Sequence, residues 1–136
     1  MTQMTGGCAC GAVRYEIAGD PVMAGHCQCG KCQKLSGTGH ASFAAFPEAA
    51  VKTTGAIGYW SYTADSGHEA QRGFCPTCGS PVIVRPKRAP GIVAITLGSL
   101  DDSSAVVPNM VFFTARGRPW DHLAADAARF PGMPPM

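Results

Sequence analysis

The chain has 136 residues, of which 46% are hydrophobic and 15% are charged, and its formal net charge is +2. This hydrophobic content excludes an intrinsically disordered chain, and the length predicts one domain over residues 1–136. No stretch approaches the roughly 18 apolar residues that a membrane-spanning helix needs, and the 17 glycines and 11 prolines favour turns and short strands.

Six segments are predicted to be β-strands. In residues 11–17, Val13, Tyr15 and Ile17 alternate with polar residues, which is typical of a half-buried strand. Residues 40–46 and 57–63 alternate more weakly. Residues 81–85 and 91–100 are β-branched and almost continuously apolar, so they are predicted to be central strands. Pro108 limits the start of the last segment, residues 106–116, to a sheet edge or a bulge.

Helix is scarce in this sequence. We expect one short helix from Cys29 to Ser36 and another from Asp121 to Ala128. The tail from Phe130 onward contains three prolines, which remove backbone donors and cannot continue a helix. Together these elements predict a mainly β fold of small antiparallel sheets with one or two short helices.

The seven cysteines are clustered rather than scattered. No basic region followed by an apolar one opens the sequence, so we expect a cytoplasmic protein, in which thiols stay reduced. Clustered thiolates in that compartment favour zinc, around which the small sheets would be organised. The groups are Cys8 with Cys10, then Cys27, Cys29 and Cys32, then Cys75 with Cys78.

Two pairs and one triplet of cysteines predict one closed four-cysteine zinc site and one open three-cysteine site. Structural zinc sites have four protein ligands, whereas catalytic sites keep one position open. Spacing alone does not decide which cysteines share an ion. An alternative ribbon of four would use Cys29, Cys32, Cys75 and Cys78, and would leave over Cys8, Cys10 and Cys27.

Five segments carry a combined pattern: GCACGAVRY (7–15), HCQCGKCQKLSG (26–37), GFCPTCGSP (73–81), GSLDD (98–102) and PW (119–120). This pattern resembles the glutathione-dependent formaldehyde-activating enzyme family, which also includes the centromere protein V proteins. The resemblance extends from residue 6 to about residue 135, and the three cysteine groups together are far more specific than any one of them. It implies a thiolate-zinc β fold with short antiparallel sheets.

The resemblance also implies two zinc ions per chain. It implies a carbon–sulfur lyase-type reaction, in which a thiol such as glutathione adds to an aldehyde such as formaldehyde, or the reverse. The expected partners are therefore small-molecule thiols and aldehydes. By resemblance, the structural zinc belongs to Cys8, Cys10, Cys75 and Cys78, and the catalytic zinc to Cys27, Cys29 and Cys32.

The chemistry of three thiolates agrees with that reaction, because zinc deprotonates a coordinated thiol. Seven thiolates and two zinc ions would change the formal charge from +2 to about −1, so we expect neither nucleic acid nor membrane as a partner. Two alternatives stay open. A non-catalytic zinc-stabilised binding module is favoured if a fourth protein ligand, such as His26 or His40, completes the three-cysteine site. A thiol redox enzyme using Cys75 and Cys78 requires a cysteine left over.

Other residues near the motifs have weaker predictions. His26 adjoins the open site and is a candidate proton carrier, but adjacent strand residues point to opposite faces, which favours a supporting position. Lys31 and Lys34 are candidates for attracting a carboxylate, against the alternative of a solvated helix face. We expect three aromatic residues to lie in the core rather than in a pocket wall: Tyr59, Trp60 and Phe74.

Overall fold

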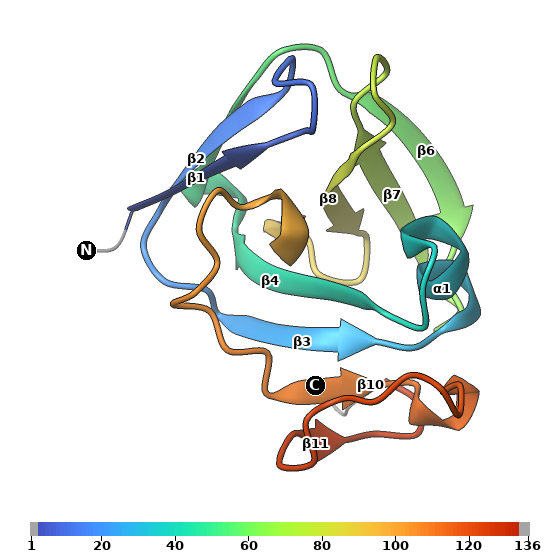
Figure 1. The fold of residues 1–136 in the computed structure, drawn as a ribbon. Helices are drawn as coiled ribbons and strands as arrows, with labels where there is room; N and C mark the ends of the chain where they lie inside the picture. The colour runs from blue at the N-terminus through green and yellow to red at the C-terminus, as the bar shows by residue number, and fades with distance from the viewer. Residues whose placement is uncertain (1–2, 134–136) are drawn as a thin grey trace.

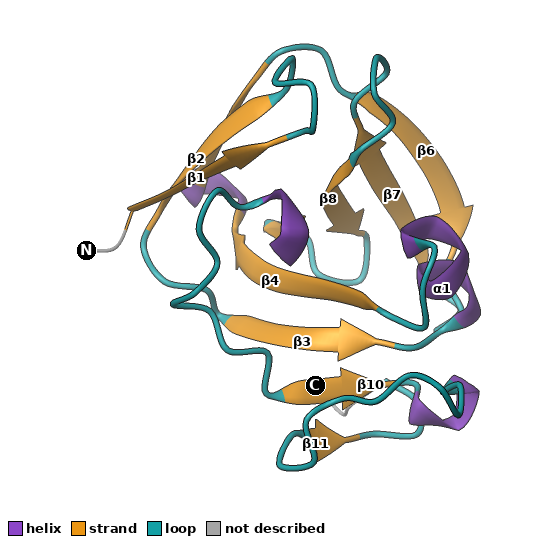
Figure 2. Cartoon of the chain, viewed as in Figure 1, coloured by secondary structure: helices purple, strands orange, loops and turns teal. Residues whose placement is uncertain are grey.

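The structure is a computed structural model that describes residues 3–133 and is built mainly of β-strands (Figures 1 and 2). Its one α-helix, α1, covers Gly30–Ser36, and 3₁₀-helices cover Glu48–Ala50, Leu97–Ser99 and Thr114–Arg116. The strands are β1 (Gln3–Gly7), β2 (Arg14–Ala18), β3 (Met23–Cys27), β4 (Ala41–Pro47), β5 (Val51–Thr54), β6 (Gly58–Thr63), β7 (Glu69–Phe74), β8 (Pro81–Pro86), β9 (Ile92–Thr96), β10 (Met110–Phe112) and β11 (Ala128–Arg129).

The strands form two sheets. The small sheet has the order β1-β2-β5 and is antiparallel. The large sheet has eight strands in the order β11-β10-β3-β4-β9-β8-β7-β6, and its only parallel pairs are β11 with β10 and β10 with β3. The predicted mainly β class is therefore confirmed, and β8 and β9 lie inside the large sheet as their continuous apolar character indicated.

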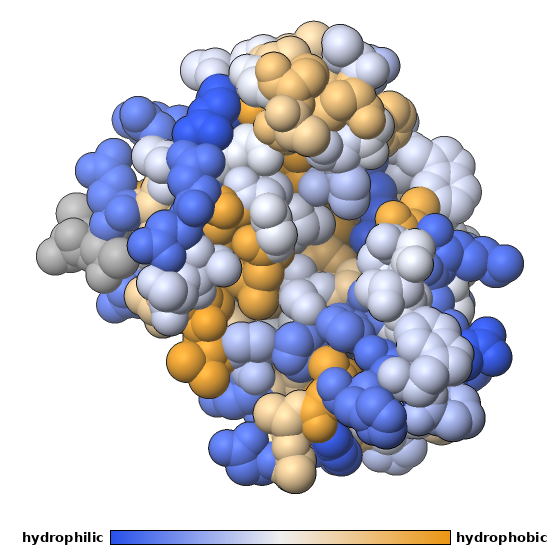
Figure 3. Space-filling model, in the orientation of Figure 1, coloured by the Kyte–Doolittle hydropathy of each residue, from blue (hydrophilic) through white to orange (hydrophobic). Residues whose placement is uncertain are grey.

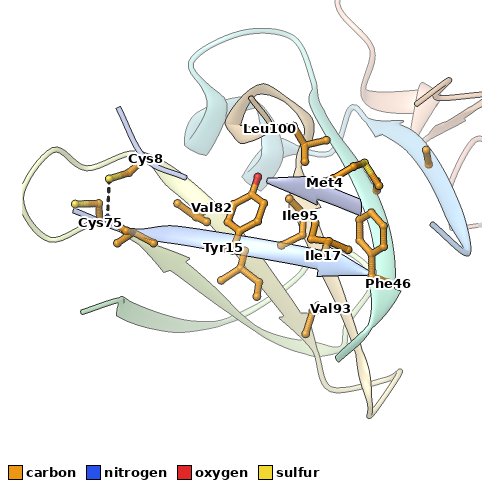
Figure 4. Close-up of a cluster of buried hydrophobic side chains, with 14 residues drawn as sticks. Met4, Cys8, Tyr15, Ile17, Phe46, Cys75, Val82, Val93, Ile95 and Leu100 are labelled. Atoms are coloured by element: carbon orange, nitrogen blue, oxygen red, sulfur yellow. Dashed lines mark hydrogen bonds between the residues drawn. The ribbon is translucent and has the colours of Figure 1, made fainter. Parts of the chain in front are cut away.

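The small sheet packs against one face of the large sheet. Tyr15 and Ile17 of β2 are buried while Arg14 and Glu16 are exposed, which confirms the predicted alternation. Figure 4 shows these two side chains among apolar residues of β4, β8 and β9. Burial of this cluster supplies the main apolar stabilisation that holds the two sheets together.

Helix α1 begins and ends where its local chemistry dictates. Cys29 precedes it in an extended conformation, and the Cys29 sulfur accepts a hydrogen bond from the backbone N–H of Cys32. Gly37 follows it with φ of 78°, a left-handed conformation that favours glycine and closes the last turn. The helix therefore holds two cysteines of the central motif in a fixed geometry.

The predicted helix over residues 121–128 is wrong. That segment is irregular up to the short strand β11, because the Asp121 carboxylate is bound by His40 and Gln28 and so short a helix is marginal without packing. Strands β9 and β10 are also shorter than the segments predicted for them. The tail that we expected to be non-helical extends to Pro134 and Pro135, which lie outside the described residues.

Four of the strands that the sequence analysis missed are β1, β3, β5 and β7. Their sequences are rich in glycine, alanine and polar residues, so no apolar period-2 pattern marks them. Pairing with neighbouring strands, rather than intrinsic propensity, makes these segments extended. Among the described residues, no helix has the length and apolar character needed to cross a membrane.

Tyr15 joins the two sheets through a hydrogen-bond chain. The Ser99 hydroxyl donates to the carbonyl of Thr96 at 2.7 Å, so it accepts from the Tyr15 hydroxyl at 2.6 Å. Gly6 makes this possible, because a Cβ there would lie 2.3 Å from the Tyr15 oxygen. Burial raises the pKa of Tyr15 to about 12, since a phenolate would lose both solvation and its donor role.

We predict that Tyr15 makes the fold sensitive to alkaline pH. Its folded pKa exceeds its unfolded value, so its contribution to stability is complete below pH 10 and is lost as pH rises from about 10 to 12. A shift of this size corresponds to a loss of about 2 to 3 kcal/mol. Urea unfolding between pH 9 and 12 should show a shallower decline in Tyr15→Phe. The same slope in Tyr15→Phe and in the exposed-site control Tyr59→Phe would contradict this.

Candidate metal centres

The first cysteine cluster lies between the two sheets. Cys8 and Cys10 follow β1 of the small sheet, and Cys75 and Cys78 follow β7 of the large sheet. The four sulfurs all lie within 4.8 Å of one another. Figure 4 shows Cys8 and Cys75 at the edge of the apolar core. This cluster therefore connects residues far apart in sequence at a point where the sheets meet.

The sulfur spacing in this cluster fits a tetrahedral ion. The Cys10 sulfur lies 3.6 Å from the Cys8 sulfur and 3.7 Å from the Cys75 sulfur. Four sulfurs at 2.3 Å from a tetrahedral zinc would be about 3.8 Å apart. The ligand set and its geometry thus suit a closed metal site.

The backbone around this cluster supports negative sulfurs. The Cys75 sulfur accepts from the N–H groups of Thr77 and Cys78 at 3.4 and 3.5 Å, and the Cys8 sulfur accepts from the N–H of Val13 at 3.2 Å. Hydrogen bonds from Ser80 lower the pKa of Cys78 to about 5. Gly79 has φ of 80°, which allows the tight turn after the CPTC segment.

The second cluster contains the remaining three cysteines. Cys27 ends β3, Cys29 caps α1 and Cys32 lies in the first turn of that helix. All three are buried, and their sulfurs lie within 4.8 Å of one another. Among residues 3–133, no histidine, aspartate or glutamate joins this group. Three protein ligands leave one position of a tetrahedral ion open.

Without a metal ion, the closeness of the three sulfurs disfavours the ionisation of more than one of them. Hydrogen bonds from the thiols of Cys27 and Cys32 lower the pKa of Cys29 to about 2. The same contacts raise the pKa of Cys27, because one thiolate in the group disfavours a second. A metal ion would replace the shared protons and let all three ionise, so the donor set fits a thiophilic metal.

Arg72 is the main contributor to this site that the sequence analysis missed. Its guanidinium donates to the Cys32 sulfur at 3.1 Å and to the Tyr62 hydroxyl at 2.8 Å. It lies 5.4 Å from the ring centroid of Phe43 and 5.5 Å from that of Tyr62, within cation–π range. The residue is only 7% exposed. A buried arginine would partly balance the negative charge of three metal-bound thiolates.

A cavity of about 400 Å³ opens beside this cluster. All three cysteines and Arg72 line it, together with side chains from the large sheet. That volume lies within the range of small-molecule sites. The three-cysteine cluster therefore offers only three ligands to a metal ion and lies next to a space for a further ligand.

His26 points away from this cavity. Its Nδ1 is 2.7 Å from the Ser42 hydroxyl, and its ring is in edge-to-face contact with the His40 ring, with ring centroids 5.0 Å apart. Burial, and then the repulsion of His40, lower the pKa of His26. His40 in turn bonds Asp121 at 2.9 Å. His26 is not among the cavity-lining residues, which favours the supporting position over the proton carrier.

The other residues marked by sequence are more dispersed. Lys31 borders the cavity, whereas Lys34 is exposed on the last turn of α1. Tyr59 and Trp60 are 43% and 47% exposed on the edge strand β6, so the prediction that they lie in the core is wrong. Phe74 is partly buried. Trp60 instead stacks on Tyr62, with ring centroids 4.9 Å apart, and Tyr62 in turn accepts a hydrogen bond from Arg72.

Comparison with known proteins gives two findings. Residues 3–116 match a family described as "Glutathione-dependent formaldehyde-activating enzyme". A crystal structure of a Rhodobacter sphaeroides protein has a TM-score of 0.59 and 23% identity, and the match covers 77% of this chain and 92% of that chain. At this identity the structural likeness concerns the fold alone.

We predict different outcomes for one serine substitution in each cluster. Cys75→Ser should give insoluble or unfolded protein, because metal binding at such sites contributes on the order of 10 kcal/mol to folding. Cys29→Ser should keep the fold with one metal ion fewer, since serine is itself a good helix N-cap. Metal content and thermal unfolding measure both effects. Equal thermal destabilisation of the two variants would refute this division.

Arg72 gives a second prediction. Arg72→Met keeps the length and apolar stem of the side chain but removes its charge and its hydrogen bond to the Cys32 sulfur. Loss of such a partner typically weakens metal binding about 10- to 100-fold, and chelator competition would measure this. The control is Arg85→Met, because Arg85 also lies over an aromatic ring but pairs with Glu48. Unchanged affinity in Arg72→Met would show that the contact is dispensable.

Proposed function

The chain belongs to the glutathione-dependent formaldehyde-activating enzyme family, and on that premise we propose that it is a zinc-dependent carbon–sulfur lyase-type enzyme. It adds a thiol to an aldehyde, or catalyses the reverse reaction, at the three-cysteine cluster. Glutathione and formaldehyde are the pair that the family name suggests. The observation that carries the proposal is three buried sulfurs, without a fourth protein ligand among the described residues, beside a cavity.

Zinc is the proposed metal at both clusters, with two ions per chain. Cys8, Cys10, Cys75 and Cys78 hold the structural ion in this proposal, and the other three cysteines hold the catalytic one. When bound, zinc supplies Lewis acidity, so that a thiol in its fourth position gives up its proton at neutral pH. The all-sulfur donor sets support zinc over the harder metal ions.

The chain's own residues prepare the site for that reaction. Cys27, Cys29 and Cys32 fix the position of the reacting thiol at the base of the cavity. Arg72 donates to the Cys32 sulfur and offsets negative charge as the incoming thiol ionises. The apolar walls exclude water, which would otherwise hydrate the aldehyde. The carbon–sulfur bond forms as the carbonyl π bond breaks, and the thiol proton ends on the aldehyde oxygen.

The two alternative functions have less support. A fourth protein ligand at the three-cysteine cluster would favour a non-catalytic binding module, but His26 and His40 are engaged with Ser42, with each other and with Asp121. A thiol redox enzyme would need a cysteine outside the metal clusters. All seven cysteines lie in the two clusters and form no disulfide.

We propose that residues 1–136 act as one zinc-binding domain in the cytoplasm. A reducing compartment keeps seven thiols available for metal. The partners are small-molecule thiols and aldehydes. Nucleic acid has no role in this proposal, because the protein with two zinc ions and seven thiolates carries a formal net charge of only about −1.

The direct test is formaldehyde consumption with glutathione, measured against the uncatalysed background. Wild-type zinc protein should exceed the background, and its rate at subsaturating thiol should rise with pH, because coordination requires thiol deprotonation. Cys27→Ser should reduce the rate to the background. Removal of zinc should do the same, and reloading should restore activity. A wild-type rate equal to that of Cys27→Ser would remove the support for this substrate pair.

A further inference from the structure

The large sheet has apolar side chains on both of its faces. On β4, Ala44 and Phe46 point into the core, whereas Phe43 and Ala45 line the cavity. The adjacent strand β9 repeats this alternation. A sheet face in contact with water normally carries polar residues. The cavity face therefore has the character of an interior surface.

One row of directly paired residues crosses five strands along this face. Strand register places Met23, Ala45, Ala94, Val84 and Arg72 side by side on β3, β4, β9, β8 and β7. All five line the cavity. The two alanines at the centre leave the space that larger side chains would fill, and the row ends at Arg72 beside the Cys32 sulfur. The cavity therefore leads to the three-cysteine cluster.

The polar groups of the cavity are few and are mostly engaged. Arg72 is bound to Cys32 and Tyr62, and Asp65 accepts from the N–H of Gly30 at 2.9 Å. Lys31 and Arg88 are partly exposed, so they border the opening rather than the interior. In the view of Figure 3, hydrophilic and apolar residues are mixed over the surface.

This composition disfavours glutathione as the occupant. Glutathione carries two amides, two carboxylates and an ammonium group, and each costs free energy when it is buried without a hydrogen-bond partner. An apolar body, in contrast, gains free energy for every methylene that leaves water. The volume of about 400 Å³ is sufficient for a small molecule with such a body.

We infer that the cavity binds the apolar body of the thiol substrate, so that the preferred substrate is an alkyl or aryl thiol rather than a polar peptide thiol. This inference rests on the proposed function, because it takes the three-cysteine cluster as the site of the reacting sulfur. Small polar thiols would still reach the cluster but would gain nothing from the row that begins at Met23.

The test compares ethanethiol, butanethiol, hexanethiol and glutathione with formaldehyde and zinc-loaded protein. Each added methylene should raise kcat/KM about threefold to fourfold, and hexanethiol should exceed glutathione by about tenfold or more. Ala94→Leu fills the centre of the row and should reduce the rise of kcat/KM with the length of the alkyl chain. The control is the same change at exposed Ala105, which should keep the full slope.

A second measurement does not depend on turnover. Calorimetric titration with hexanol and ethanol, which do not react, should show binding of hexanol alone, with a negative heat-capacity change that Ala94→Leu abolishes. If kcat/KM were higher for glutathione than for hexanethiol and hexanol did not bind, the inference would be overturned and the proposed reaction would stand. Hexanol binding without consumption of formaldehyde by any thiol would instead support the cavity assignment and overturn the reaction.

Discussion

Four sulfur atoms join the two sheets of this protein, and the rest of the structure depends on that junction. Cys8 and Cys10 leave the small sheet where Cys75 and Cys78 leave the large one, with sulfur spacings that suit a tetrahedral ion. A domain of this size has a net stability of only about 5 to 15 kcal/mol, so one metal ion at this point would contribute much of it. The junction holds the small sheet on one face of the large sheet.

The opposite face of the large sheet is then free to form a site. Strand alternation places Ala44 and Phe46 in the core and Phe43 and Ala45 in the cavity, so the same strands serve both purposes. The three-cysteine cluster lies at the base of that cavity because β3 ends at Cys27 and α1 begins after Cys29. In the proposed function, stability and chemistry are thus assigned to different cysteines and different faces.

Electrostatics explains why the second cluster needs more than its cysteines. Three thiolates around a dication leave a net negative charge in a buried place, which is costly without compensation. The Arg72 guanidinium supplies a positive charge 3.1 Å from Cys32, and the rings of Phe43 and Tyr62 hold it there. Burial lowers the pKa of Arg72, but the attraction and hydrogen bonding of Cys32 and Tyr62 together outweigh that effect and raise it.

From the sequence alone, the cysteine groups that could hold a metal and much of the β structure were predictable, because cysteine spacing and the alternation around Tyr15 are local properties. It did not decide whether Cys75 shares its cluster with Cys8 or with Cys29, since ligands from distant segments meet only after strand pairing. Arg72 had no motif to mark it and became part of the site only through the register of β7 with β8. The helix expected over 121–128 failed for the same reason, because Asp121 bonds His40, a partner 81 residues away that no local pattern specifies.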